Sequence, residues 1–147
     1  LRTFSKAWGL AGLRIGFGIC SSEALRAALD LTRTPFNINA VAQMAAVAAL
    51  KAQEYMNANI VSAESERSHV AKLLRGLSFK VAPSLGNFLF FDTQQSSKVI
   101  AERLLRHGTI VKPWKQDGFS TFIRVSIGSE QENNKFIDDI TRVAEIR

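Results

Sequence analysis

The sequence predicts an α/β protein with a small α+β subdomain in its C-terminal part. From residue 78, short apolar runs alternate with amphipathic stretches in the order β-β-α-β-β-α. Before that point the chain has a glycine-rich opening segment and long stretches with helical patterning. We expect residues 1–57 to belong to another unit, residues 58–77 to form a bridging helix and residues 78–147 to form the small subdomain.

The first half contains one expected strand and three expected helices. Residues 14–20, RIGFGIC, have the pattern of a buried strand. Ser21 or Ser22 is a suitable N-cap for a helix over residues 23–33, which Pro35 then stops. Asn39 can cap a second, alanine-rich helix over residues 40–56. A third helix is expected over residues 58–75, with Gly76 as its C′ residue.

The second half supplies the small subdomain. Strands are expected over residues 79–82 and 87–92, followed by a helix from Ser96 or Ser97 to His107 that Gly108 closes. Strands over residues 109–114 and 121–128 come next. The last helix begins with a capping box, because Ser129 precedes Glu132 by three residues.

Composition limits the class of protein. The chain has 147 residues, 46% of them hydrophobic, which is typical of a globular protein. The net charge of +6 is spread along the chain without a dense basic cluster, so a nucleic-acid partner is not favoured. A lone cysteine and the lack of a signal peptide or apolar span predict a cytoplasmic protein without membrane contact. The first residue is Leu, and we expect a fragment.

Lys6 lies in an unusual chemical setting. Residues 1–22 contain no acidic residue, and Arg14 follows Lys6 among glycine and apolar neighbours. A site low in water and close to positive charge would lower the pKa of a lysine and make it a nucleophile. With the hydroxyls of Thr3 and Ser5, this set suits a phosphorylated aldehyde. The alternative is a surface lysine beside glycines that shape a turn.

Arg124 is the second candidate. It alternates with Ile123, Val125 and Ile127, so a strand would place it on the opposite face from these apolar residues. Its guanidinium can donate two parallel hydrogen bonds to a planar anion. The alternative is an arginine that faces solvent.

The segment TFSKAWGLAGLRIGFGI resembles the cofactor-lysine segment of fold-type I pyridoxal-phosphate aminotransferases, most of all that of the histidinol-phosphate aminotransferase family. The pattern S-K-x-x-G-x-x-G-x-R-x-G is matched by Lys6, Gly9, Gly12, Arg14 and Gly16. PFNIN, GNFLFF, GTIVKPW and IRVSIGS agree in order and spacing. The resemblance implies the C-terminal portion of an aspartate aminotransferase-like fold, in which residues 1–57 end the large cofactor-binding domain.

The resemblance also implies roles for individual residues. Lys6 would carry the covalent link to pyridoxal 5'-phosphate, while Thr3, Ser5 and Arg14 would hold its phosphate. Arg124 would bind the substrate's carboxylate or phosphate with help from Lys112, although most family members have Arg in place of Lys112. Asn37 is a weaker substrate-binding candidate, and its neighbour Asn39 is sufficiently explained as an N-cap.

The implied activity is transfer of an amino group between glutamate or 2-oxoglutarate and histidinol phosphate or imidazole acetol phosphate, in histidine biosynthesis, by a homodimer. The family's residues that orient the cofactor ring lie upstream of this chain, so we expect the fragment alone to be inactive. No His, Cys or carboxylate spacing suggests a metal site.

Other functions stay open. The motifs do not separate this activity from that of another aminotransferase or a phosphothreonine decarboxylase. GFGICS at residues 16–21 has part of a dinucleotide-binding fingerprint, but its third glycine is replaced by Ser21. The chain could also be a non-catalytic scaffold.

Overall fold

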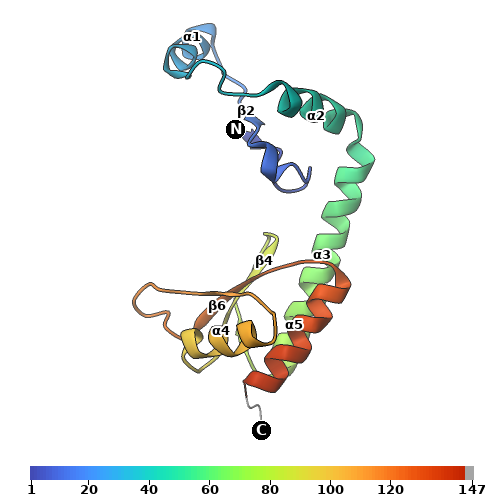
Figure 1. Cartoon of the computed structure of the whole chain (residues 1–147), viewed down its shortest axis with the longest axis vertical. Coiled ribbons are helices and arrows are strands. Elements are labelled where there is room, and N and C mark those ends of the chain that lie inside the picture. Colours follow the sequence, from blue (N-terminus) through green and yellow to red (C-terminus); the bar gives the residue numbers. More distant parts are fainter. Residues whose placement is uncertain (145–147) are drawn as a thin grey trace. The chain divides into compact units, whose positions relative to one another are not determined.

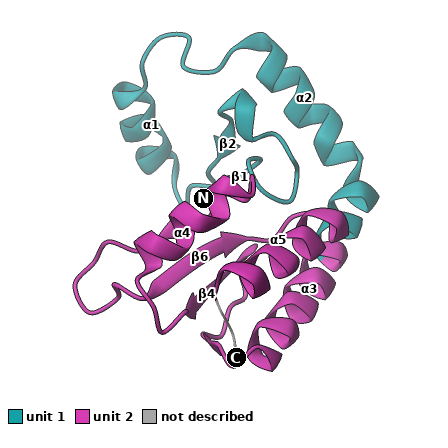
Figure 2. Ribbon diagram, turned by 60° about the horizontal axis from the view of Figure 1, so that its bottom comes forward, with its two compact units in different colours: residues 1–60 teal, residues 61–147 magenta. Residues whose placement is uncertain are grey.

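A computed structural model describes residues 1–144, which divide between two compact units, residues 1–60 and residues 61–144 (Figure 2). The first unit contains β1 (Arg2–Thr3), the short 3-10 helix η1 (Ala11–Leu13), β2 (Gly16–Phe17), α1 (Glu23–Thr32) and α2 (Ala40–Lys51) (Figure 1). Helix α3 (Gln53–Gly76) begins in the first unit and ends in the second. Over residues 1–144, no helix has the length and apolar character needed to cross a membrane.

The helices α1 and α2 begin where the sequence predicts. The Ser22 hydroxyl accepts a hydrogen bond from the Leu25 N–H at 3.2 Å, and the Asn39 side chain accepts one from the Ala42 N–H at 2.8 Å. Each bond satisfies a backbone donor that has no partner inside the helix. Ser22, one of the two candidate N-caps of α1, and Asn39, the predicted N-cap of α2, are therefore confirmed.

Two predictions for the first unit are wrong. The helix expected over residues 40–56 ends at Lys51, because Ala52 leaves the helical region with φ −101° and ψ 48°, and α3 begins at Gln53. Alanine is the best helix former, so nothing in the local sequence marks this break. The strand expected to be buried over residues 14–20 is reduced to Gly16–Phe17, and both residues are exposed because β2 pairs with β1 alone in the described chain.

The second unit is built on a four-stranded antiparallel sheet with the strand order β3-β4-β6-β5. The strands are β3 (Lys80–Val81), β4 (Phe88–Asp92), β5 (Lys112–Pro113) and β6 (Phe122–Ser126), with helices α4 (Ser97–Arg106) and α5 (Glu130–Val143) between and after them. The predicted order β-β-α-β-β-α is confirmed, although β3 and β5 are shorter than expected.

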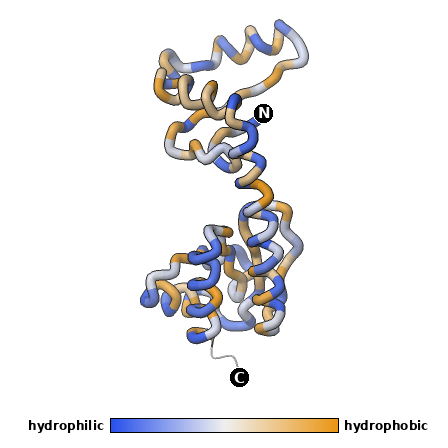
Figure 3. Tube along the Cα trace, turned by 90° about the vertical axis from the view of Figure 1, so that its right-hand side faces the viewer, coloured by the Kyte–Doolittle hydropathy of each residue, from blue (hydrophilic) through white to orange (hydrophobic). Residues whose placement is uncertain are grey.

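One face of this sheet forms the core of the second unit. Figure 3 shows that hydrophobic and hydrophilic positions are interleaved along the chain. Buried hydrophobic residues of α3, α4 and α5 cluster with those of the sheet. The sheet contributes alternate residues of β4 and β6, as the period of two requires. The core contains Val70, Ala71, Leu74, Phe79, Leu89, Phe91, Ile100, Leu104, Ile123, Val125, Phe136, Ile140, Val143 and Ala144.

The helix ends of the second unit agree only in part with those predicted from the sequence. The capping box of α5 is confirmed, and hydrogen bonds from the Ser129 hydroxyl and N–H lower the pKa of Glu132. Gly108, with φ 79°, closes α4 as predicted. Gly76, expected at C′, is instead the last residue of α3. The Phe79 N–H donates to the Leu74 carbonyl at 3.1 Å, which puts the left-handed position at Ser78, with φ 67°.

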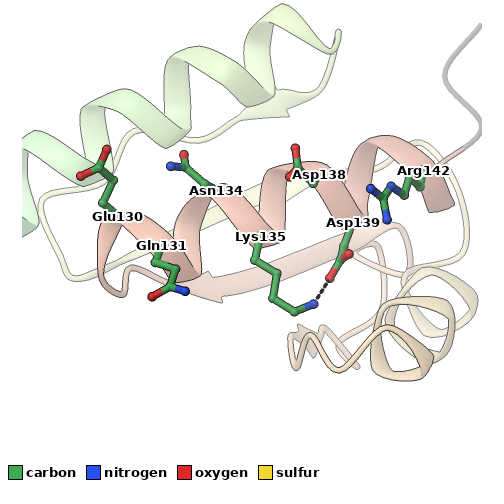
Figure 4. Close-up of a pocket in the computed structure, with 7 residues that line it drawn as sticks. All are labelled: Glu130, Gln131, Asn134, Lys135, Asp138, Asp139 and Arg142. Carbon is green, nitrogen blue, oxygen red and sulfur yellow. Dashed lines mark hydrogen bonds and ion pairs between the residues drawn. The ribbon is translucent and has the colours of Figure 1, made fainter.

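A buried carboxylate joins α5 to the connection between α4 and β5. Asp139 is 4% exposed, and its Oδ2 accepts hydrogen bonds from Lys135 Nζ and Thr109 Oγ1, both at 2.5 Å (Figure 4). Lys135 Nζ also donates to the His107 carbonyl at 2.7 Å. Burial alone raises the pKa of Asp139, but the bonds from Lys135 and Thr109 outweigh it and lower the pKa.

Candidate active site

The segment around Lys6 is a loop between the two strands of the first unit. Thr3 lies opposite Gly16 in the β1–β2 register. Beyond the strands, the Phe4 N–H donates to the Ile15 carbonyl at 3.2 Å, and the Leu10 N–H donates to the Phe4 carbonyl at 2.9 Å. The backbone of Phe4 is therefore bonded to Leu10, in the middle of the loop, and to Ile15, just before β2. These backbone hydrogen bonds hold the loop closed.

An aromatic ring anchors this loop. Phe4 is 3% exposed, and its ring centre lies 5.7 Å from that of Trp8 and 5.6 Å from that of Phe17. Aromatic residues bury a large apolar area, so this cluster supplies the main apolar contact of the loop. Lys6, two residues after the anchor, is exposed.

Backbone geometry explains two glycines of the lysine motif. A Cβ at Gly16 would lie 2.6 Å from the Arg2 carbonyl oxygen, so only glycine fits there. Gly9 has φ 72°, which favours glycine, and its N–H donates to the Lys6 carbonyl at 2.8 Å. Arg14 also has a left-handed backbone, with φ 53°, and its Nη1 donates to the Ala11 carbonyl at 2.7 Å.

The four residues expected to bind the cofactor all belong to β1 and the loop that follows it. The Thr3 hydroxyl accepts a hydrogen bond from the Ser5 N–H at 3.0 Å. Thr3, Lys6 and Arg14 are exposed, and Ser5 is half-buried. Within the described residues Lys6 is exposed, so this loop alone does not form the expected site low in water, and that expectation stays a prediction.

Asn59 is a positioning contact that the sequence did not indicate. Its Nδ2 donates to the Ala7 carbonyl at 3.1 Å and so ties the residue after Lys6 to the first part of α3. Asn59 is one polar residue among many on α3, so nothing in the local sequence indicates that it contacts the Lys6 loop.

Arg124 and Lys112 come together on the sheet face opposite the core. Arg124 is half-buried, while its neighbours Ile123 and Val125 are 0% and 7% exposed, so the predicted alternation is confirmed. In the β5–β6 register Lys112 lies directly opposite Arg124. Directly opposite residues share one face of a sheet, and the two cations therefore present their charge on the same side.

Aromatic residues surround these cations. A cavity of about 400 Å³ beside Arg124 is lined by Ala82, Pro83, Phe88, Phe90, Trp114, Gln116 and Phe119. The Phe90 ring centre lies 5.3 Å from Trp114, 5.8 Å from Phe119 and 4.9 Å from Phe122. The face combines flat apolar walls with a fixed guanidinium, which suits a planar substrate that carries an anionic group.

Asn37 has a hydrogen bond within its own segment of the first unit. It is exposed in the connection between α1 and α2, where its Oδ1 accepts a hydrogen bond from Arg33 at 3.3 Å. The dinucleotide alternative also loses its structural basis, because all strand pairs within residues 1–144 are antiparallel and the fingerprint requires a parallel βαβ unit.

Comparisons with known proteins cover nearly the whole of this chain. The family model for aminotransferase class I and II matches residues 1–140. Histidinol-phosphate aminotransferase 1 of Mesorhizobium japonicum is 56% identical over 143 residues, which make up 97% of this chain and 39% of that protein. Histidinol-phosphate aminotransferase 3 of Rhizobium meliloti is 51% identical over the same shares of both chains.

A solved structure shows the same fold. The crystal structure of histidinol-phosphate aminotransferase from Sinorhizobium meliloti in complex with pyridoxal-5'-phosphate matches with a TM-score of 0.88 and 27% identity, over 97% of this chain and 40% of that chain. The predicted aspartate aminotransferase-like fold is confirmed. This chain spans about two-fifths of the length of the curated relatives it matches. The match over residues 1–140 shows that it belongs to the aminotransferase class I and II family.

Proposed function

We propose that this chain supplies the cofactor lysine and the anion-binding face of a pyridoxal-phosphate-dependent aminotransferase that acts on histidinol phosphate and 2-oxoglutarate. The observation that carries the proposal is the pair Lys112 and Arg124, which lie directly opposite each other on the open sheet face. Identities of 56% and 51% to two histidinol-phosphate aminotransferases support this substrate over that of other aminotransferases or a decarboxylase.

The residues of the Lys6 loop fit pyridoxal phosphate in their chemistry. The loop offers a primary amine, two hydroxyls and a guanidinium, and residues 1–22 contain no acid to repel a phosphate. Lys6 would bind the aldehyde, and Thr3, Ser5 and Arg14 would hold the phosphate. When bound, the cofactor supplies an electron-withdrawing ring that stabilises negative charge at the substrate Cα.

The chain's own residues then bind substrate and move a proton. Arg124 donates paired hydrogen bonds to a carboxylate, or to the phosphate of the phosphorylated partner. Lys112 adds a positive charge on the same face, as a point charge without the fork of an arginine. Lys6, freed when the substrate amine binds, would take the proton from the substrate Cα and deliver it to C4′ of the cofactor, so that the amino group stays with the cofactor and the keto acid leaves.

Chemical labelling tests the role of Lys6. We expect the full-length protein, incubated with pyridoxal phosphate and reduced with borohydride, to gain one pyridoxyl group that peptide mapping assigns to Lys6. Lys6→Arg keeps the charge but should lose the label, whereas Lys51→Arg, at the exposed end of α2, should keep it. A label on another lysine of the unchanged protein would overturn the proposal.

Four finer features also belong to the proposal. We place the enzyme in the cytoplasm as a homodimer, and we expect residues 1–147 alone to be inactive. Sedimentation of the full-length protein tests the homodimer. Activity assays of the full-length protein and of residues 1–147 test the inactivity of the shorter chain. Asn37 is proposed as a substrate contact because the family resemblance puts its loop near the active site. Asn37→Ala should then raise the KM for histidinol phosphate and leave cofactor binding unchanged.

A further inference from the structure

Two like charges lie opposite each other on the open face without a carboxylate partner. Arg124 and Lys112 are direct cross-strand neighbours, and like charges in this arrangement are unfavourable. Among the ion pairs and hydrogen bonds of residues 1–144, none joins either side chain to an acid. Another kind of contact must therefore hold the two cations in position.

Aromatic rings provide that contact. The Arg124 guanidinium carbon lies 4.6 Å from the centre of the Phe88 ring, and Lys112 Nζ lies 5.2 Å from the centre of the Trp114 ring. Both distances are within the range of about 6 Å over which the face of an aromatic ring attracts a cation. A ring holds the cation without neutralising it, so the guanidinium can still donate to an anion.

The Phe88 ring is placed by the turn that precedes β4. The Ser84 hydroxyl donates to the Phe88 carbonyl at 2.7 Å and accepts from the Gly86 N–H at 3.2 Å, and Arg67 donates to the Gly86 carbonyl at 3.1 Å. A Cβ at Gly86 would lie 2.9 Å from Phe88 Cε1 and 3.2 Å from its Cδ1. The ring therefore occupies the space that a side chain at Gly86 would fill.

We propose that Phe88 is a positioning residue that holds the Arg124 guanidinium ready for the anionic end of a substrate, and that Gly86 provides the space for its ring. The inference rests on the proposed role of Arg124 as the substrate-binding cation. Phe88 acts through Arg124: it orients the guanidinium before the anion arrives, which reduces the entropy lost when the anion binds.

Binding of glutarate, a dicarboxylate without an amino group, tests this role apart from turnover. We expect Phe88→Leu in the full-length protein to raise the Kd for glutarate about 3- to 10-fold, as measured by isothermal titration calorimetry. Phe88→Tyr, which keeps a ring, should bind like the unchanged protein. When Arg124→Gln is already present, Phe88→Leu should have no further effect.

Glycine substitutions supply a matched pair. Gly86→Ala should push the Phe88 ring aside and weaken glutarate binding about twofold or more. Gly76→Ala should leave binding unchanged, since a Cβ there meets nothing within 4 Å. These variants keep Phe88 itself, so they test the position of the ring even if Phe88→Leu does not fold.

The outcomes separate the two proposals. Unchanged glutarate binding in Phe88→Leu and Gly86→Ala would overturn this inference, even if histidinol phosphate is transaminated. Glutarate binding that depends on Phe88 and Arg124, in a protein that does not transaminate histidinol phosphate, would support this inference while the proposed function fails.

Discussion

The two units are held together in different ways. In residues 61–144, side chains from α3, α4, α5 and the sheet bury one continuous core. In residues 1–60, the buried apolar residues are Phe4, Ala42 and Ala46, while Leu31 of α1 and Met44 of α2 are 90% and 74% exposed. The first unit keeps its local shape through helix caps, backbone hydrogen bonds and glycines. Lys6, the proposed cofactor lysine, thus lies in the unit that depends on backbone geometry, and the proposed anion-binding face lies on a packed scaffold.

Removal of a core ring should have the largest effect, confined to the second unit. Phe91 is fully buried between Phe79 and Phe136, so Phe91→Ala should destabilise this unit by about 3–5 kcal/mol. Leu31→Ala, on the exposed side of α1, should change stability by less than about 0.5 kcal/mol. Hydrogen exchange of the β4 and β6 amides measures the effect of Phe91→Ala, and exchange of the α1 amides measures that of Leu31→Ala; equal effects would contradict the difference between the units.

Function on the second unit should be separable from its stability. Arg124→Lys loses the paired donors and should weaken binding of anionic substrates by about 1–3 kcal/mol. Cofactor loading and amide exchange should stay unchanged in Arg124→Lys. The control is Arg75→Lys, at the exposed end of α3, which should leave substrate binding, cofactor loading and amide exchange unchanged. Loss of cofactor in Arg124→Lys would show that this residue does not serve the substrate alone.

The Lys6 loop should respond to backbone crowding. Gly16→Ala places a Cβ against the Arg2 carbonyl and should strain the β1–β2 pair by about 1–3 kcal/mol, which lowers borohydride labelling of Lys6. Gly12→Ala meets nothing within 4 Å and should label normally. Normal labelling of Gly16→Ala would show that the strand pair does not position the lysine.

The smallest expected effect comes from the buried carboxylate of α5. Because the pKa of Asp139 is lower in the folded protein than its ordinary value of 3.8, its contribution is present above that value and is lost as pH falls through the lower folded value. Asp139→Asn should cost about 1 kcal/mol at neutral pH and flatten this acid dependence. Acid unfolding of the variant and of the unchanged protein measures this difference. Asp138→Asn, on the exposed side of α5, is the control.

The sequence predicts best what depends on local chemistry. The caps at Ser22, Asn39 and Ser129 are confirmed because each hydrogen bond spans three residues of one segment. The alternation around Arg124 is confirmed because a strand between a core and an open face permits no other pattern. The lysine motif is recognisable because Gly9 and Gly16 meet strict backbone demands.

Features that depend on tertiary contacts were not predictable. The break at Ala52 lies in a run with high helix propensity, and the C′ position at Ser78 follows from where Phe79 enters the core. The exposure of Lys6 and the contact from Asn59 depend on what packs around the loop, which residue types alone do not reveal. The pairing of Lys112 with Arg124 depends on the register between β5 and β6, which becomes known only from the structure of the sheet.

Each unit contains one of the chain's two tryptophans, at the point where its ligand is proposed to bind. Trp8 touches Phe4 in the lysine loop, and Trp114 lies between Lys112 and Phe90 on the sheet face. Their fluorescence therefore provides two internal reporters of occupancy. The part of the emission change lost in Trp114→Phe reports on the proposed anion-binding face, and the part lost in Trp8→Phe reports on the Lys6 loop, so stopped-flow traces of the two variants time the order in which the two ligands arrive.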